Sequence, residues 1–295
     1  MSHSRGLAYL LLCLTMLFWA GNWVIGRALR GEIEPFALNL ARWAIAVAVL
    51  APFALPALRG QGAAIRRHWG ILALLALTGV ALFHALIYVG LKTTTTVNAV
   101  LLNSSLPLFI LACSWILERE QSTPRQVGGM LLSFAGILAI LSRGELQGLR
   151  QFDVHAGDLW ILLAMPIWGV YSVLLKRRPP ELGAVGFLFV LALGGMLMLV
   201  PAAALEAAYA PPRWPSAAAA AGVLYIALFA SVIAFICWNR GVAIVGANKA
   251  GFTLHLLPVF GTLLAIAFLG ETFQPFHAAG IATILAGVLV ATRAR

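Results

Sequence analysis

Two stretches of this chain repeat each other: residues 103–120 read NSSLPLFILACSWILERE, and residues 254–271 read LHLLPVFGTLLAIAFLGE. Each is a long apolar run that has a proline near its start and a glutamate at its end. Pro107 and Glu120 recur as Pro258 and Glu271, both after 151 residues. A constant offset between such residues in apolar sequence indicates an internal repeat, so we expect a chain of two similar halves.

Further matches extend the repeat over five segments of each half. Near the start, FWAGN at 18–22 resembles IWGVY at 167–171, at an offset of 149. Matches at an offset of 151 are Gly90 with Gly241, Ala99 with Ala250, Gly129 with Gly280, and Gly136 with Gly287. The sequence therefore predicts two repeat domains, 1–148 and 149–295.

The composition predicts an all-α integral membrane protein. Hydrophobic residues make up 62% of the chain and charged residues 10%, and the mean hydropathy is +0.95. Soluble domains carry about 25% charged residues, so this chain has too little charge to cover a water-facing surface. Apolar runs that can span a bilayer as helices are 7–26, 36–56, 70–91, 95–117, 126–142, 159–175, 183–204, 219–239, 250–269 and 278–292.

These ten predicted transmembrane helices divide into five per half, so the second half is expected to enter the membrane inverted. Lys and Arg concentrate in the cytoplasmic loops of membrane proteins. With a cytoplasmic N-terminus, thirteen of the 20 Lys and Arg residues fall on the inner side and seven, including Arg42, on the outer side. We expect a multi-pass protein of the inner (plasma) membrane with both termini in the cytoplasm. Two inverted five-helix repeats around a central cavity are typical of transporters.

Other classes of site are not predicted. The formal net charge of +10 comes mostly from connecting segments, where Lys and Arg anchor a chain to lipid headgroups, so no nucleic-acid partner is expected. The three cysteines are scattered within apolar runs, which argues against disulfides and a metal site. We expect no cofactor. The expected partners are the lipid bilayer and a small-molecule substrate, and a monomer is favoured although the oligomeric state is open.

The repeat resembles a known family. A Trp-centred first span, a fourth span with a proline and a terminal glutamate, and a Gly-rich fifth span in each half resemble the EamA-type branch of the drug/metabolite transporter superfamily. The resemblance covers essentially the whole chain, and within that branch it is strongest to bacterial exporters of aromatic amino acids and related metabolites. It implies a basket-like bundle, in which the first four helices of each half surround a central cavity and the fifth lies at the periphery.

Polar and aromatic side chains at membrane depth are costly and often mark function. The predicted substrate-binding residues are Trp19, Asn22, Trp23, His84, Tyr88, Asn98, Asn103, Ser104, Trp168, Tyr171, Trp238, Asn239, Lys249 and His255. Trp19 and Trp168 lie too deep in their spans for an interfacial aromatic belt. His84 fits either a cavity wall or a packed hydrogen bond between helices.

Several of these residues have an alternative interpretation. The repeat places Asn98 opposite Lys249 and Ser104 opposite His255, which would bring each pair near the cavity. Lys249 either extends to the inner interface or binds a substrate carboxylate. Ser104 with His255 also fits a serine hydrolase, although no orienting acid or glycine loop for an oxyanion accompanies them.

Two prolines are candidate hinges. Pro107 and Pro258 lie within their spans, where a proline removes a helical hydrogen bond and kinks the helix. Symmetric kinks in both halves are plausible bending points for opening and closing. Glu120 and Glu271 are expected to be structural caps or loop ion pairs.

The positions of the acidic residues limit the class of substrate that we expect. All ten Asp and Glu residues lie in loops or at span ends, whereas an antiporter of lipophilic cations is expected to bury an acid. We predict a transporter rather than an enzyme, exporting amino acids, aromatic ones foremost, or related metabolites by alternating access and facilitated diffusion. The alternatives are a sugar-phosphate or nucleotide-sugar carrier, a multidrug exporter and an intramembrane enzyme.

Overall fold

The computed structural model describes residues 2–94, 96–142, 155–211, 215–269 and 274–293, and these residues form helices and no β-strand. The first half contains α1 (Ser2–Ala28), η1 (Leu29–Gly31), α2 (Pro35–Ala57), α3 (Gly62–Arg67), α4 (Trp69–Ala76), η2 (Leu77–Leu82), α5 (Phe83–Thr93), α6 (Thr96–Asn103), α7 (Leu106–Glu118) and α8 (Pro124–Leu141). The second contains α10 (Ala156–Leu174), η3 (Leu175–Arg177), η4 (Pro180–Leu182), α11 (Gly183–Tyr209), α12 (Ala217–Tyr225), η5 (Ile226–Ile233), α13 (Ala234–Val245), α14 (Ala247–Phe252), η6 (Thr253–His255), α15 (Leu256–Leu269) and α16 (Pro275–Arg293). The predicted all-α membrane fold is confirmed.

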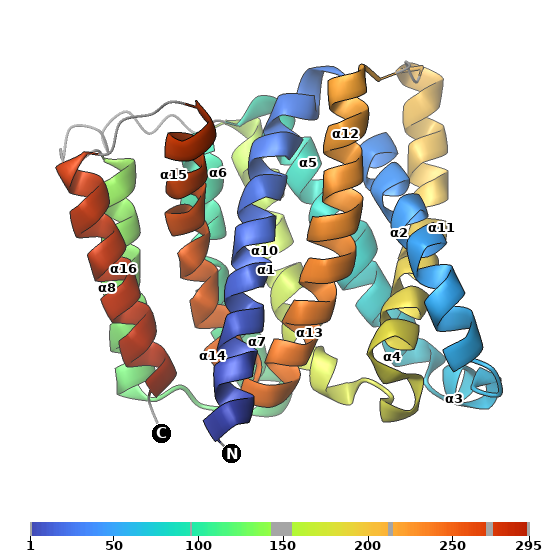
Figure 1. Cartoon of the computed structure of the whole chain (residues 1–295), viewed down its shortest axis with the longest axis horizontal. Helices are drawn as coiled ribbons and strands as arrows, with labels where there is room; N and C mark the ends of the chain where they lie inside the picture. Colours follow the sequence, from blue (N-terminus) through green and yellow to red (C-terminus); the bar gives the residue numbers. More distant parts are fainter. Residues whose placement is uncertain (1, 95, 143–154, 212–214, 270–273, 294–295) are drawn as a thin grey trace.

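Nine helical segments of the described chain are long and apolar enough to cross a membrane. They correspond to nine of the ten predicted spans. The remaining run, 250–269, is built from α14, η6 and α15, which follow one another across the bundle (Figure 1). This crossing is therefore present as a broken span instead of one long helix.

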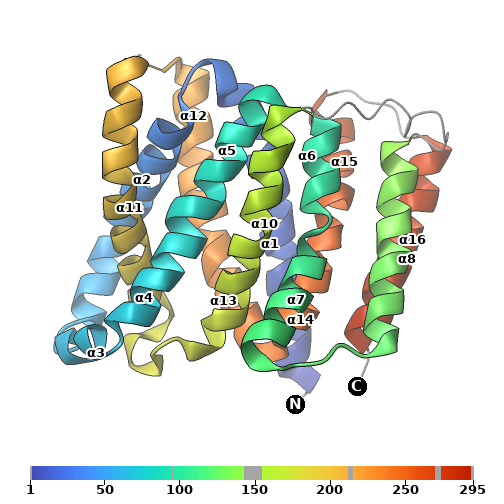
Figure 2. The ribbon, with the colours of Figure 1, turned by 180° about the vertical axis from the view of Figure 1, so that it is seen from behind.

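Equivalent helices of the two halves run in opposite directions. Both ends of the chain lie at the same edge of the bundle, where α1 begins, whereas α10 begins at the opposite edge (Figure 1). The broken spans show the same relation, since the chain descends from α6 to α7 but ascends from α14 to α15 (Figures 1 and 2). We refer below to the edge with the chain ends as the terminal face and to the other edge as the distal face.

The two halves interleave at the centre of the bundle. α1 packs along α13 and α15 of the second half, and α10 packs along α5 and α7 of the first half. α2 packs along α11. Helices in lipid associate through close van der Waals packing and hydrogen bonds, because lipid tails are as apolar as their side chains. The functional centre is consequently made by residues of both halves.

The fifth helix of each half lies outside this interleaved core. α8 and α16 pack against each other at one end of the molecule (Figure 2). Their repeat-related glycines lie at the contact: a Cβ on Gly136 would come within 2.7 Å of the Gly280 carbonyl oxygen, and one on Gly129 within 2.6 Å of that of Gly287. The Gly-rich fifth spans therefore bring two backbones together within one chain.

Each third span contains a π-helical segment at the middle of its length, η2 in the first half and η5 in the second. Such segments leave carbonyl groups outside the regular hydrogen-bond pattern and are frequent at functional sites. Here side chains bind those carbonyls: the Asn39 amide donates to Ala81 at 3.1 Å, and the Ser231 hydroxyl donates to Ile226 at 2.8 Å. Nothing in the apolar sequence of these spans predicts them.

At the expected kinks beside Pro107 and Pro258 the regular α-helix is briefly interrupted, by residues 104–105 between α6 and α7 and by η6 between α14 and α15. Pro107 lies in the first turn of α7, just after α6 has ended, and Pro258 lies in the first turn of α15, just after η6. A proline fits there because the first N–H groups of a helix have no helical partner. Carbonyls freed at the breaks are bound by hydroxyls, as where Ser105 donates to Leu102 at 2.6 Å.

The contact between α8 and α16 predicts a position-specific effect on stability. Gly136→Leu should destabilise the protein by about 1–3 kcal/mol, because the added side chain meets backbone atoms that cannot move aside. Thermal melting of the purified protein in detergent measures the change. Gly128→Leu in the same helix is the matched control, since a Cβ at Gly128 meets nothing within 4 Å. Equal loss of stability in the two variants would contradict the proposed packing.

Candidate functional site

A small cavity lies at the centre of the bundle, between the two halves. Its volume is about 20 Å³, which is close to the room that one water molecule needs. Its lining consists of Trp19, Asn22, Trp23, Phe83, His84, Ile87, Asn103, Leu106, Trp168, Leu254 and Leu257. Six of the predicted site residues are in this set, so the expected central cavity exists, but in this conformation it is too small for a substrate.

Aromatic rings fill the space around the cavity. The repeat-related Trp19 and Trp168 meet edge to face with their centroids 5.1 Å apart, one from each half. Trp238 lies 5.3 Å from Trp19 and 5.8 Å from Trp168. Phe235 contacts both Trp19 and Trp168, and His84 lies 6.2 Å from Trp168. This central aromatic cluster (Trp19, His84, Trp168, Phe235 and Trp238) closes the cavity.

Polar atoms within the aromatic cluster lack partners in the described structure. The indole N–H groups of Trp168 and Trp238 and the Nδ1 of His84 are buried without a hydrogen bond. Trp19 differs, since its indole N–H donates to the carbonyl of Ala230 at 3.1 Å. A buried donor without an acceptor costs about 1–3 kcal/mol, so these groups are candidates for binding a polar ligand.

Two equivalent hydrogen bonds flank the aromatic cluster. In the first half the Tyr88 hydroxyl donates to the Asn22 side-chain oxygen at 2.9 Å, and in the second half the Tyr171 hydroxyl donates to that of Asn239 at 2.8 Å. All four side chains are buried and were predicted site residues. The asparagine is on α1 and the tyrosine on α5 in the first half, whereas the tyrosine is on α10 and the asparagine on α13 in the second half. The same contact is therefore made with the two residue types exchanged.

Arg42 is the main functional candidate that sequence reasoning missed. It was counted among the outer-side charges, but it lies within α2 and is fully buried. Its Nε donates to the Ser231 hydroxyl at 2.8 Å and its Nη1 to the Tyr88 hydroxyl at 2.7 Å. The signal was present, because residue 42 falls inside the predicted span 36–56, where an arginine is costly.

The broken spans meet through His255. Its Nε2 lies 2.9 Å from the carbonyl oxygen of Ser104, and its Nδ1 contacts the Ser133 hydroxyl of α8. The repeat-related Ser104 and His255 therefore do come together, but they do not line the central cavity. The Ser104 hydroxyl donates to Val100 at 2.7 Å instead of to the imidazole, which is not the arrangement of a nucleophile and its base.

The expectation that no carboxylate is buried is wrong for Asp158. This residue at the start of α10 is 7% exposed and accepts hydrogen bonds from Thr94, from the Asn98 amide at 2.8 Å and from the His155 backbone N–H at 2.8 Å. α5 covers it, since the adjoining Gly157 lets the two backbones approach closely. Asp158 is outside the central cavity, whose lining in the described structure contains no carboxylate.

The predicted pairing of Asn98 with Lys249 is wrong. Asn98 binds Asp158 near the distal face, whereas Lys249 lies in α14 near the terminal face (Figure 1). An inverted repeat sends matched residues far from its axis to opposite faces, so only pairs close to the axis meet. Lys249 is partly exposed and does not line the cavity.

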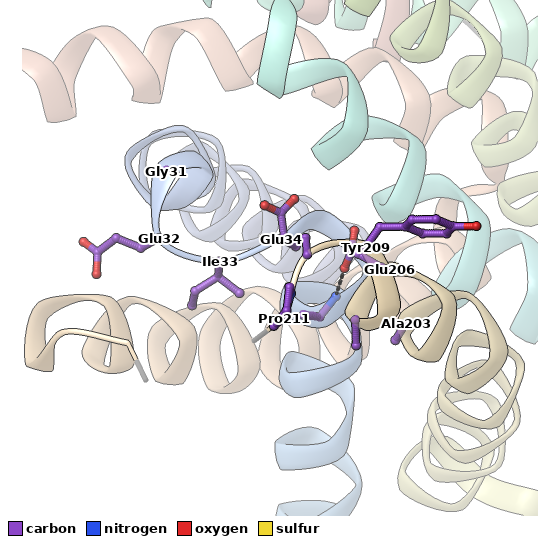
Figure 3. Close-up of a pocket in the computed structure, with 11 residues that line it drawn as sticks. Gly31, Glu32, Ile33, Glu34, Ala203, Glu206, Tyr209 and Pro211 are labelled. Atoms are coloured by element: carbon purple, nitrogen blue, oxygen red, sulfur yellow. Dashed lines mark hydrogen bonds between the residues drawn. The ribbon is translucent and has the colours of Figure 1, made fainter. Parts of the chain in front are cut away.

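A larger pocket of about 500 Å³ opens at the distal face, between the start of α2 and the end of α11. Figure 3 shows Glu206 directed at the first turn of α2, where its carboxylate accepts from the backbone N–H groups of Phe36 at 3.1 Å and Ala37 at 2.8 Å. A carboxylate at a helix N-terminus is stabilised by the free N–H groups there. This contact joins the two halves at the distal face.

An ion-pair cluster joins the halves at the other end of the bundle. The Glu118 carboxylate at the end of α7 binds Lys176 and accepts from Arg177 at 2.7 Å, both in η3. Beside it the Glu120 carboxylate accepts from the Ser114 hydroxyl at 2.9 Å, which fits the expected capping role. Glu271 lies outside the described residues. Contacts between the halves are thus present at both faces of the bundle.

A membrane bundle of two interleaved halves around a central polar and aromatic site defines a membrane transporter. The chain belongs to the EamA-like transporter family, whose model matches residues 6–142 and again 155–293. The resemblance seen in the sequence is thereby confirmed, and the relatives point to a transporter rather than to an enzyme.

Individual relatives match over almost the whole chain. An uncharacterized transporter of Archaeoglobus fulgidus is 31% identical over 289 residues, 96% of each chain. The aromatic amino acid exporter YddG of Ancylobacter novellus is 27% identical over 296 residues, 98% of each chain. A solved crystal structure that is 24% identical superposes with a TM-score of 0.76 over 99% of this chain and 97% of its own. The last comparison supports the fold.

The bonds around Asp158 predict a strong effect of its removal. Asp158→Ala should lower stability by about 1–3 kcal/mol, because the buried Thr94 and Asn98 donors lose their acceptor. Thermal melting in detergent measures the loss, and Glu181→Ala is the control, since Glu181 is an exposed acid. A melting temperature unaffected by Asp158→Ala would show that the carboxylate does not hold α10 to α5 and α6.

Proposed function

We propose that this protein exports aromatic amino acids or related small metabolites from the cytoplasm by alternating access, moving its substrate down a concentration gradient. It works as a monomer in the cytoplasmic membrane, with both termini on the cytoplasmic side. The observation that carries the proposal is the central aromatic cluster with its unpartnered N–H groups. A relative described as an aromatic amino acid exporter supports the same substrate class.

The chemistry of the centre suits a planar, polar solute. Aromatic rings stack on other rings, with edge-to-face or offset contacts that favour a flat ligand. The free indole N–H groups of Trp168 and Trp238 offer hydrogen bonds to its polar part. The described lining carries no acid to attract a lipophilic cation, which favours a neutral or zwitterionic substrate over a cationic drug.

Closure at both ends supports alternating access. The cavity of about 20 Å³ leaves no room for a substrate, and contacts between the halves lie on both sides of it: Glu118 with η3 at the terminal face and Glu206 with α2 at the distal face. A substrate enters when one set of contacts opens and leaves when the other does. The breaks before Pro107 and Pro258 are the proposed bending points.

Flux through the purified protein tests the proposal. Liposomes containing the full chain should release labelled Phe, Tyr or Trp faster than empty vesicles, and a rise in unlabelled amino acid on the far side should accelerate exchange. A proton gradient should have no effect on the direction of net flux. Transport of none of these amino acids above the empty-vesicle rate would refute the proposed function.

Replacement of one indole tests the aromatic cluster. Trp168→Phe keeps an aromatic ring and removes the unpartnered N–H, so flux should fall about fivefold, as for the loss of one neutral hydrogen bond. Trp160→Phe is the matched control, because Trp160 lies on the same helix and is 43% exposed on its outer side. A comparable fall in both variants would locate the effect in general folding, and melting curves of both proteins check this directly.

The two closing contacts predict opposite changes of access. In a cysteine-free background with Leu257→Cys in the cavity lining, Glu118→Gln should speed modification by an impermeant maleimide from the terminal face. Glu206→Gln should speed it from the distal face. Exposed ion pairs and carboxylates at a helix N-terminus are weak contacts, so changes of about twofold to fivefold are expected. Identical changes from both faces would contradict the assignment.

A further inference from the structure

Arg42 carries a buried positive charge without a negative partner in the described structure. Its two hydrogen-bond partners, Ser231 and Tyr88, are neutral hydroxyls. Its guanidinium also lies 5.3 Å from the ring of Trp43 and 5.9 Å from that of Tyr88. Its remaining nitrogen, Nη2, is buried and unpartnered among the described residues. The side chain therefore has a charge that no described carboxylate neutralises and a donor that no described residue accepts.

Such an arrangement is unfavourable in a resting protein. A guanidinium does not lose its proton inside proteins, so Arg42 cannot escape its burial by becoming neutral. Buried charges are normally paired with an opposite charge, because removal from water is costly. Within a membrane, an ionisable residue of this kind more often serves a substrate or ion pathway than the fold.

The described carboxylates are engaged elsewhere. Glu34 forms an ion pair with Lys92, and Glu118 forms ion pairs with Lys176 and Arg177. Asp158 accepts hydrogen bonds from Thr94 and Asn98, and Glu206 accepts from the backbone of α2. Glu32 accepts from the Ser216 backbone N–H, and Glu120 accepts from Ser114. Glu181 is exposed. These acids of the described chain do not reach Arg42, which points to a negative group from outside.

The repeat shows that the fold does not need this charge. The hydrogen bond between Tyr88 and Asn22 has an equivalent in that between Tyr171 and Asn239, with nearly the same length. At offsets of 149 to 151, however, Arg42 corresponds to residues 191–193 of α11, which are Leu, Ala and Leu. The second half thus builds the same bridge without a cation, so Arg42 has a role beyond holding the bridge.

Arg42 is connected to the central cavity through two hydrogen bonds. It donates to the Tyr88 hydroxyl, which donates to Asn22, and Asn22 lines the cavity. His84, one turn before Tyr88 on the same helix, also lines it. Tyr88 is therefore the side chain that separates Arg42 from the cavity lining along this path.

We propose that Arg42 binds the carboxylate of the transported molecule, while the central aromatic cluster holds its apolar part. This deepens the proposed function and rests on it for the identity of the substrate. Arginine suits the task because its planar fork matches the two oxygens of a carboxylate. One cation matches one carboxylate, and the described lining of the cavity contains no Lys or Arg that would add the further charge a phosphate requires.

A pair of simple probes tests the carboxylate site. Phenylacetate and phenethylamine share an aromatic ring but carry opposite charges. Calorimetric titration of the purified full chain should show phenylacetate binding about a hundredfold more tightly than phenethylamine, as expected for a buried charge pair. Arg42→Gln should abolish this preference. Arg42→Lys keeps the charge without the fork and should retain part of it.

A matched pair of variants separates the site from general damage. Tyr88→Phe and Tyr171→Phe each remove one buried bond to an asparagine, but only Tyr88 also contacts Arg42. The preference for phenylacetate should fall in Tyr88→Phe and keep its wild-type ratio in Tyr171→Phe. Equal loss in the two variants overturns the proposal, because the effect would then follow from the bridge and not from Arg42.

Two further outcomes distinguish this inference from the proposed function. Flux of labelled Phe that is unchanged by Arg42→Gln overturns the carboxylate site and leaves the exporter standing. If phenylacetate binding depends on Arg42 but the chain transports no amino acid, the carboxylate site is supported and the proposed export function is refuted. If phenylacetate does not bind to the wild-type chain, the inference is overturned. This binding measurement uses the wild-type chain alone, so it does not depend on a variant that might fail to fold.

Discussion

The structure depends on one constraint: inside a bilayer every backbone N–H and C=O must find its partner within the protein. An unbroken helix meets this constraint alone, but the places where this chain departs from regular helix need help from other elements. At the break before Pro107, the Ser104 carbonyl accepts from His255, which itself lies at the break before Pro258. At this point a carbonyl freed in one half is bound by a side chain of the other half, and the two breaks hold each other in place.

The irregular segments also supply hydrogen-bond partners to residues of the functional site. The π-helical segment η5 binds the indole of Trp19 through Ala230 and holds Ser231 against Arg42. The corresponding segment η2 is bound by Asn39 of α2. Trp19 and Arg42 themselves project from the regular helices α1 and α2, and η5 supplies the carbonyl and the hydroxyl that accept their hydrogen bonds.

Much of the architecture followed from the sequence because it rests on long-range regularities. Apolar runs of about 20 residues and a constant repeat offset identify the spans and the two halves, whatever the details of packing. A nearly equal offset of 149 residues paired Trp19 with Trp168 and Asn22 with Tyr171, and these residues do lie at or beside the centre. Residues near the repeat axis are brought together by symmetry alone, so an alignment of the halves is enough to find them.

The remaining features depend on distances between helices and between hydrogen-bonding groups, which a sequence pattern does not specify. Asp158 is buried where Gly90 and Gly157 let the backbones of α5 and α10 approach closely. The break at 104–105 replaces the expected kink because the local hydroxyls supply its hydrogen bonds. Arg42 was assigned to the surface by its charge, although its position within a span already argued for burial. The small volume of the cavity reflects one closed conformation, which composition does not specify.

The lone charge of Arg42 also has an electrical consequence. It lies inside the bilayer, and moving one elementary charge across the whole membrane field changes the energy by about 2.3 kcal/mol per 100 mV. With a carboxylate bound, the local pair is neutral, but the ammonium group of a zwitterionic amino acid keeps the net charge of the loaded protein equal to that of the empty one. The membrane potential therefore acts on both forms whenever these charges move through the field. A carrier of cargo without net charge would in this way be sensitive to voltage because of a charge of its own.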